Sequence, residues 1–250
     1  MKRYLYLILT LALCSCEVIN EADRLIPMPF PETSEHRHVL IEFTGFRCVN
    51  CPAASEIAQA LKEAYPEQLY VVAMHPASNP FTQGIYDYTC PAADSIYQLL
   101  GGTATTPFPA GNIDLDVFEG SYFSDPDQWA TMVYEAMADT MAPYLYVSAK
   151  ADSVKREIRV TPQYTAKDDL QLSFWLVEDS VLGVQALPGG GIDMNYYHRH
   201  LLRAVSDKTT FPIPDGCRPA YCSVVAVLYD KNDHYILNTY ETFLDFSTDY

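Results

Sequence analysis

The sequence predicts an α/β domain followed by an all-β sandwich, with the change near Ala142–Pro143. Before this point, short apolar runs alternate with segments in which apolar residues recur every three or four positions, the pattern of strands covered by helices. After it, apolar residues recur at every second position, and no helical stripe interrupts the pattern. A series of such strands is typical of two packed antiparallel sheets.

The N-terminus predicts export and a lipid anchor. Lys2 and Arg3 precede residues 4–13, which carry no charge and are too few to span a bilayer, since a span takes roughly 20 residues. A basic start with a short apolar core is typical of a secretory signal. The following "LCSC" resembles the bacterial lipobox, in which the cysteine is lipidated, for example with palmitate, and becomes the mature N-terminus. We expect residues 1–15 to be the signal peptide and Cys16 the lipidated residue; an ordinary thiol after a plain signal is the alternative.

Residues 16–37 predict a tether between the lipid anchor and the folded domains. They carry prolines at positions 27, 29 and 31 and show neither a helical nor a strand period. The formal net charge of −16 repels nucleic-acid phosphates and no basic stripe offsets it, so we expect no nucleic-acid partner. An exported chain folds in an oxidising setting, which makes its remaining cysteines candidates for disulfides: Cys48, Cys51, Cys90, Cys217 and Cys222.

The α/β domain is predicted over residues 38–142. "HVLIEF" at 38–43 and "LYVVAM" at 69–74 are short apolar runs typical of strands that are buried on both faces. Pro52 opens a helical stripe between them. Strand, helix and strand in this order predict a right-handed unit with parallel strands. A short helix, a turn that enters a strand and a longer helix ending before Pro143 complete the domain.

The all-β domain is predicted over residues 143–250. Apolar residues alternate with polar ones at 145–151 and again at 170–176. Residues 223–243 predict two strands joined at a Lys-Asn-Asp turn. Cys217 and Cys222 flank "RPAY" just before a strand, where we expect a local structural disulfide.

The segment "GFRCVNC" is the strongest candidate for chemistry. A thiolate at a helix start is stabilised by unpaired N–H groups and by the helix dipole, so Cys48 is expected to be exposed and to attack. Cys51, further into the helix, would resolve the mixed disulfide. Arg47 would stabilise the Cys48 thiolate, and Glu42, a partly buried carboxylate on the preceding strand, would take the proton from Cys51.

"IEFTGFRCVNC" at 41–51 resembles the thioredoxin pattern, in which a strand ends in an acidic and an aromatic residue before the two cysteines. Glu42 and Phe43 match these two positions. The resemblance implies a cis-proline beside the dithiol; Pro107 is the candidate and Pro109 the alternative.

The chain departs from thioredoxin in three places. Arg47 replaces a tryptophan, and Val49-Asn50 replaces Gly-Pro. The stretch between Cys51 and Pro107 is longer than usual, which suggests an insertion near residues 76–93.

The whole layout is similar to the 28-kilodalton outer membrane protein family of Bacteroidetes. The blocks "EFTGFRCVNCP" (42–52) and "YYHRHLLRA" (196–204) carry this resemblance. It implies a lipoprotein of the cell envelope, anchored at the outer membrane, with a thioredoxin-like domain at 38–142 followed by an immunoglobulin-like sandwich at 143–250. The family's biochemical role is poorly defined, so it implies location and fold more than a reaction.

Two functions stay open. The first is thiol–disulfide exchange with exported proteins or peptides, in which the membrane is reached only through the lipid. The second is a surface binding or adhesion lipoprotein whose thioredoxin-like domain is a scaffold with a structural disulfide. A metal site is a third use of the cysteines, but no ligand pairs have a zinc-finger spacing and the "HRH" at 36–38 lacks a third ligand, so we expect no metal and no cofactor.

Overall fold

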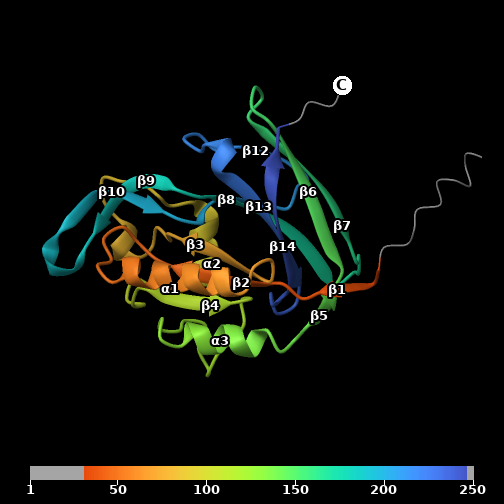
Figure 1. Cartoon of the computed structure of the whole chain (residues 1–250), viewed down its shortest axis with the longest axis horizontal. Coiled ribbons are helices and arrows are strands. Elements are labelled where there is room, and N and C mark those ends of the chain that lie inside the picture. Colours follow the sequence, from red (N-terminus) through yellow and green to blue (C-terminus); the bar gives the residue numbers. More distant parts are fainter. Residues whose placement is uncertain (1–30, 247–250) are drawn as a thin grey trace, which may run out of the picture.

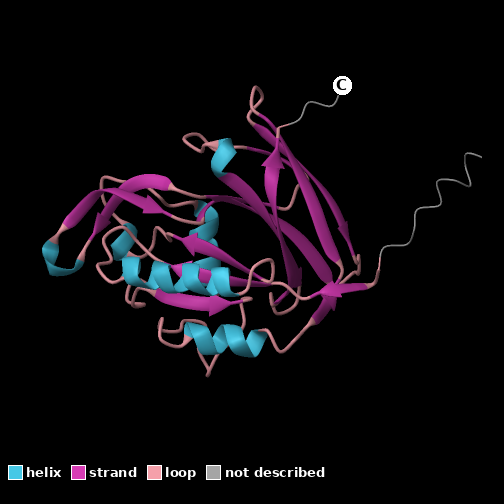
Figure 2. Cartoon of the chain, viewed as in Figure 1, coloured by secondary structure: helices cyan, strands magenta, loops and turns pink. Residues whose placement is uncertain are grey.

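The computed structural model describes residues 31–246, which form a mostly β structure with three α-helices in this range (Figures 1 and 2). The first half contains β1 (Thr33–Glu35), β2 (His38–Phe43), α1 (Cys51–Ala64), β3 (Leu69–Met74), α2 (Pro91–Leu99), β4 (Ala110–Ile113), α3 (Trp129–Ala136) and β5 (Met141–Pro143).

The second half of the described chain contains strands and short 3-10 turns. The strands are β6 (Leu145–Asp152), β7 (Glu157–Tyr164), β8 (Leu170–Glu178), β9 (Val181–Ala186), β10 (Ile192–His198), β11 (Leu201–Ser206), β12 (Thr210–Pro212), β13 (Cys222–Asp230) and β14 (Ile236–Asp245). An all-β second region is therefore confirmed.

Most strands belong to one mixed sheet that runs through both halves of the chain. Its order is β12-β7-β6-β14-β13-β8-β11-β3-β2-β4. β2 and β3 are parallel along their whole length, as predicted, and β4 is antiparallel to β2. β11 lies beside β3 through the Leu201–Ala73 pair, so the second region extends the sheet of the first. The domain division at 142–143 stays a prediction.

Both faces of β2 and β3 are covered, which explains their unbroken apolar sequences. On one face Leu40 and Val71 pack with α1 and α3, while on the other Ile41 and Val72 pack with α2 and with residues of β8 and β13. Trp129 of α3 lies against Gly111 of β4, where a Cβ atom would be only 2.1 Å from the indole Nε1. Only glycine therefore fits at position 111.

Apart from β9 and β10, the strands of the second region all belong to this one sheet. The sheet curves: buried side chains of β6 and β7 share one hydrophobic cluster with those of β8 and β13, although β14 and β13 separate β6 from β8 in the sheet order. β14 makes the bend, since it is antiparallel to β13 but pairs with β6 in parallel only at Leu244 and Asp245. Figure 1 shows β6 and β7 standing on the right, away from the helices.

β9 and β10 leave this sheet as a separate hairpin. It extends to the left in Figure 1, above α1. The predicted signal peptide and Cys16 lie outside the described residues. Within residues 31–246 no helix has the length and apolar character needed to cross a membrane.

Candidate functional site

Cys48 and Cys51 form a disulfide at the start of α1, with their Cα atoms 5.4 Å apart. The helix begins at Cys51, and Cys48 lies in the turn before it, where its N–H donates to the Gly45 carbonyl at 2.9 Å. Each cysteine is only 1% exposed. The expectation of an exposed first sulfur is therefore wrong for this structure.

The β9–β10 hairpin covers the disulfide loop. Gln185 of β9 is buried, and its Nε2 donates to the Cys48 carbonyl at 2.8 Å. One residue later the Ala186 N–H donates to the Phe46 carbonyl at 2.7 Å. Because this hairpin comes more than 130 residues after the cysteines, nothing near the "CVNC" segment reveals the cover.

Tyr88 holds the hairpin in place from the first half of the chain. Its hydroxyl accepts a hydrogen bond from the Val184 N–H at 2.9 Å, and its ring makes an edge contact with Phe46. Gly183 permits this approach, since a Cβ atom there would lie 2.2 Å from the Tyr88 hydroxyl oxygen. Tyr88 belongs to residues 76–93, the predicted insertion, which thus contributes to the cover.

Glu42 lies buried on β2 near the disulfide, without a cation. Burial raises the pKa of its carboxyl to about 7, and hydrogen bonds from Ser55 and Thr44 only partly oppose this shift. The Ser55 hydroxyl donates to the carboxylate at 2.7 Å. Ser55, which bonds Glu42, lines the same small cavity of about 10 Å³ as Cys51.

Two histidines of this cavity were not predicted as site residues. His75 follows β3 directly and His198 ends β10, and their ring centroids lie 5.4 Å apart. Burial holds the pKa of His75 well below its usual value and lowers that of His198 to about 4, so both imidazoles are neutral at pH 7. The sequence could have indicated His75, because it directly follows β3. The carboxyl ends of the parallel strands β2 and β3 lie at the same edge of the sheet, so a residue there lies on the side of the cysteines.

Two predicted site residues are placed differently. Arg47 is exposed, and its guanidinium donates to the Gln83 carbonyl at 3.2 Å rather than to Cys48. The cis peptide bond is Phe108–Pro109, so the alternative Pro109, not Pro107, is the cis-proline. Phe108 is buried in the same hydrophobic cluster as both cysteines.

The expected Cys217–Cys222 disulfide is not formed. Both residues are buried free thiols, as is Cys90 at the start of α2. Each sulfur of the expected pair has another partner: Cys217 Sγ accepts from Arg203 Nε at 3.0 Å, and Cys222 Sγ donates to the Arg218 carbonyl at 3.4 Å.

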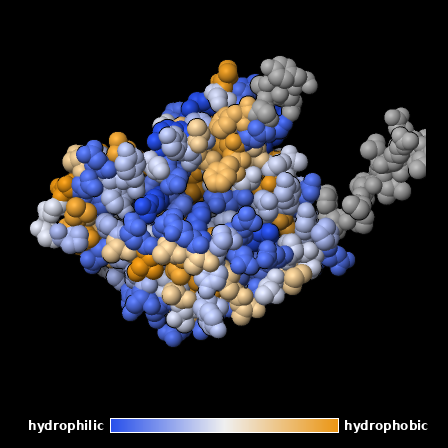
Figure 3. All heavy atoms as spheres, in the orientation of Figure 1, coloured by the Kyte–Doolittle hydropathy of each residue, from blue (hydrophilic) through white to orange (hydrophobic). Residues whose placement is uncertain are grey.

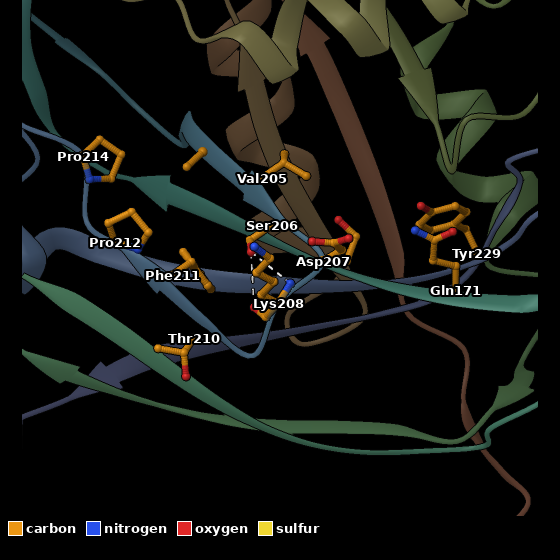
Figure 4. A pocket seen from close by; sticks show the side chains of 12 residues that line it. Gln171, Val205, Ser206, Asp207, Lys208, Thr210, Phe211, Pro212, Pro214 and Tyr229 are labelled. Atoms are coloured by element: carbon orange, nitrogen blue, oxygen red, sulfur yellow. Dashed lines mark hydrogen bonds between the residues drawn. The ribbon is translucent and has the colours of Figure 1, made fainter.

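A larger cavity, about 670 Å³, lies beside β11 and β12 (Figure 4). Ser206 and Lys208 are hydrogen-bonded to each other at its wall, and Phe211 and Tyr229 provide apolar lining. It shares no lining residue with the cavity beside Cys51. The charged residues of its wall are Asp207 and Lys208, whose opposite charges do not favour a ligand of either sign. We therefore place the candidate site at the disulfide.

One solved structure supports the fold. No protein-family profile and no curated protein sequence matches the chain. Among solved structures, HBP35 of Porphyromonas gingivalis, a Bacteroidetes protein, is similar with a TM-score of 0.63 and 19% identity, over 84% of this chain and 76% of that chain. A structural-genomics target from Agrobacterium tumefaciens gives a TM-score of 0.49 and 13% identity, over 87% of this chain and 98% of that chain. The resemblance to the 28-kilodalton family is not confirmed and stays a prediction.

Proposed function

We propose that this protein is a cell-envelope lipoprotein that carries out thiol–disulfide exchange with exported proteins through Cys48 and Cys51. The observation that carries the proposal is Glu42. A buried carboxyl without a cation is costly, and a purely structural disulfide has no use for it. With a pKa raised to about 7, it is suited to exchange a proton with a nearby thiol at neutral pH.

The proposed framework is a thioredoxin-like domain. The β2–α1–β3 unit, the antiparallel β4 and a disulfide at the start of α1 support it. Pro109 takes the part of the cis-proline in place of Pro107. Arg47 has no direct role in this proposal, since its guanidinium bonds to Gln83.

The exchange proceeds in two displacements from the oxidised pair. A substrate thiolate attacks Cys48 Sγ, the Cys48–Cys51 bond breaks, and Cys51 leaves as a thiolate that takes a proton from Glu42, whose partner Ser55 lines the same small cavity as Cys51. A second substrate thiolate then attacks the substrate sulfur of the mixed disulfide and displaces Cys48 as a thiolate. The substrate dithiol becomes a disulfide, the Cys48 thiolate takes a proton from solvent so that the protein pair becomes a dithiol, and Glu42 regains its proton from solvent.

Access to Cys48 requires movement of the β9–β10 hairpin, because both sulfurs are buried under it. The hairpin also exposes apolar side chains: Leu182, Ile192, Met194 and Tyr197. In Figure 3 hydrophobic residues occur among hydrophilic ones at the left end of the molecule, where the hairpin lies. An exported protein or peptide that contacts this surface would favour the displaced hairpin.

The second candidate function is binding or adhesion at the cell surface, with Cys48–Cys51 as a structural disulfide. Burial of both sulfurs favours this function, since a structural disulfide does not need to be reached by a substrate thiol. In both proposals a lipid at Cys16 holds the protein at the outer membrane, and nucleic acid is not a partner.

Reduction potential and trapping separate the two functions. For exchange we expect a potential above about −300 mV in a glutathione or dithiothreitol titration of the full chain; a lower value favours the structural disulfide. In Cys51→Ser the free Cys48 thiolate can still attack a substrate disulfide, which is the reverse of the exchange above. Mixed disulfides with envelope proteins should then accumulate on non-reducing gels, because Cys51 is missing and cannot displace the substrate from Cys48. Cys48→Ser is the matched control and should give far fewer. Equal trapping by both variants contradicts the proposed order of attack.

A further inference from the structure

A second cluster of reactive side chains lies at the opposite end of β2 from the disulfide. His36 precedes the strand, His38 begins it, and Asp114 follows β4. All three are buried, and one potential ligand atom from each lies within 4.8 Å of the other two. Asp114 is 76 residues from His38 in sequence, so the topology of the sheet brings the three together.

A hydrogen bond to Asp114 fixes the orientation of the His38 imidazole ring. Its Nδ1 lies 2.5 Å from Asp114 Oδ2, while Asp114 Oδ1 accepts from the Val39 N–H at 2.8 Å. Nδ1 therefore points at the carboxylate, and Nε2 is the ring nitrogen that remains for another partner. Such a carboxylate–histidine pair is the usual support of a metal-binding imidazole.

Ring nitrogens of both histidines lack a hydrogen-bond partner among the described residues although they are buried. His38 is 1% exposed and His36 3% exposed, yet His38 Nε2 and both ring nitrogens of His36 have no hydrogen-bond partner in the described part of the chain. His36 Nδ1 does lie 3.3 Å from Asp139 Oδ2, so this carboxylate already contacts one of the three nitrogens, and Nε2 of each ring remains without a hydrogen-bond partner within residues 31–246. Buried polar atoms rarely stay unpaired, so these nitrogens require a partner.

The surroundings favour a cation as that partner. His38 and Asp114 line a cavity of about 260 Å³ whose wall includes four carboxylates and neither lysine nor arginine. The carboxylates belong to Asp114, Asp116, Glu135 and Asp139. The two imidazole rings lie side by side, with centroids 3.9 Å apart, and so can turn toward one ion.

We propose that His36, His38 and Asp139 bind a divalent transition-metal ion of the Zn²⁺ class, with Asp114 holding the His38 ring in place through its bond to Nδ1. Imidazole nitrogens select Zn²⁺ and its transition-metal neighbours over Mg²⁺ and Ca²⁺, which prefer oxygen ligands. Ligand atoms of a tetrahedral zinc site lie about 3.3 Å apart, which is also the distance between His36 Nδ1 and Asp139 Oδ2. This inference does not rest on the proposed thiol–disulfide exchange.

The ion would join three separate parts of the fold. It would hold the link before β2 directly, the segment after α3 through Asp139, and the turn after β4 through the bond of Asp114 to His38. Binding to the folded chain alone raises the melting temperature with the concentration of free metal. The site is therefore structural in this proposal and needs no access to substrate.

Metal titration of the full chain, purified in detergent and freed of metal with a chelator, tests the proposal. We expect one Zn²⁺ per chain by calorimetry and a melting temperature that rises with Zn²⁺ but not with equal Mg²⁺. His38→Gln should weaken binding at least about 100-fold, and Asp114→Asn about 10- to 100-fold. Asp139→Asn changes an exposed ligand and so tests the site without risk to folding; it should weaken binding by a factor at least as large as Asp114→Asn does.

His200→Gln is the matched control, because it removes one histidine of the other "HRH" segment, whose Nε2 already contacts Gln59. It should bind Zn²⁺ like the parent chain. Co²⁺ should give visible bands without the near-ultraviolet band of a thiolate ligand, which separates this site from the free cysteines. No saturable Zn²⁺ binding by the parent chain, or equal binding by folded His38→Gln, overturns the proposal.

Discussion

Two pairs of nearby cysteines, both buried, differ in their state. Cys48 and Cys51 are bonded, whereas Cys217 and Cys222 are free, although all four are at most 4% exposed. In the second pair an arginine donates to one sulfur and a carbonyl accepts from the other. Closeness in sequence and burial are thus not sufficient for a disulfide; local partners decide which sulfurs face each other.

A buried glutamate lies near each pair, and the two glutamates also differ. Glu178 is held by Arg218 at 2.9 Å and by Arg203 at 3.5 Å. Glu42 has only hydroxyl partners, which leaves its pKa raised by burial. The carboxyl near the free pair is therefore held by two arginines, whereas the carboxyl near the bonded pair has no cation and is suited to exchange its proton.

The largest expected difference concerns alkylation. Burial raises the pKa of Cys222 to about 12 and also raises the pKa of Cys217. At about pH 8 Cys222 should react with iodoacetamide roughly 1000-fold more slowly than a free thiol. Unfolding without reductant should make both residues react, while Cys48 and Cys51 should stay unreactive until a reductant is added. Peptide mass spectrometry reads each site, and protection of Cys217 and Cys222 in the unfolded chain would restore the disulfide first expected.

The second expected difference is in how Glu42 and Glu178 contribute to the free energy of unfolding as pH changes. The folded-state pKa of Glu42, about 7, lies above the usual value of 4.5, so its contribution to stability is full below pH 4.5 and is lost as pH rises through 7. The loss amounts to roughly 3 kcal/mol, which Glu42→Gln should abolish, making the variant the more stable protein at about pH 8. Glu178→Gln should instead destabilise, because Arg203 and Arg218 lose their carboxylate. Urea unfolding at a series of pH values measures the free energy of unfolding of both variants. If that free energy depends on pH in the same way in the parent chain and in Glu42→Gln, the raised pKa of Glu42 is contradicted.

Removal of the sulfurs should affect stability unequally. Cys48→Ala with Cys51→Ala should lower the free energy of unfolding by about 2 kcal/mol, since even a short disulfide loop restricts the unfolded chain. Cys217→Ala with Cys222→Ala loses no covalent link and should cost about 1 kcal/mol through lost packing. Urea unfolding of oxidised samples measures both changes. A smaller loss for the first pair than for the second would show that the bonded pair is not the stabilising one.

The sequence predicts elements well and distant contacts poorly. β2 and β3 match the predicted runs 38–43 and 69–74, because two-sided burial leaves an unbroken apolar signature. The bonded pair and Glu42 also follow from local patterns, since strand, turn and helix place them within one unit. Gln185 over Cys48 and Asp114 beside His38 do not, because these contacts join segments 137 and 76 residues apart. Alternating strand residues predict a face but not which other segment covers it.

The smallest expected effect tests whether the hairpin controls access to the bonded pair. Tyr88→Phe leaves the Val184 N–H without its acceptor under the hairpin, a loss of about 1–2 kcal/mol that makes local opening more frequent. Reduction of Cys48–Cys51 by dithiothreitol should then be about 5- to 30-fold faster. Leu182→Ala, an exposed change on the same hairpin, should leave the rate near that of the parent chain. Stopped-flow or quenched alkylation follows the reduction, and Cys217 and Cys222 should keep their slow alkylation in both variants because the hairpin does not cover them. An unchanged rate in Tyr88→Phe would mean that reductant reaches the sulfurs by a route other than hairpin opening.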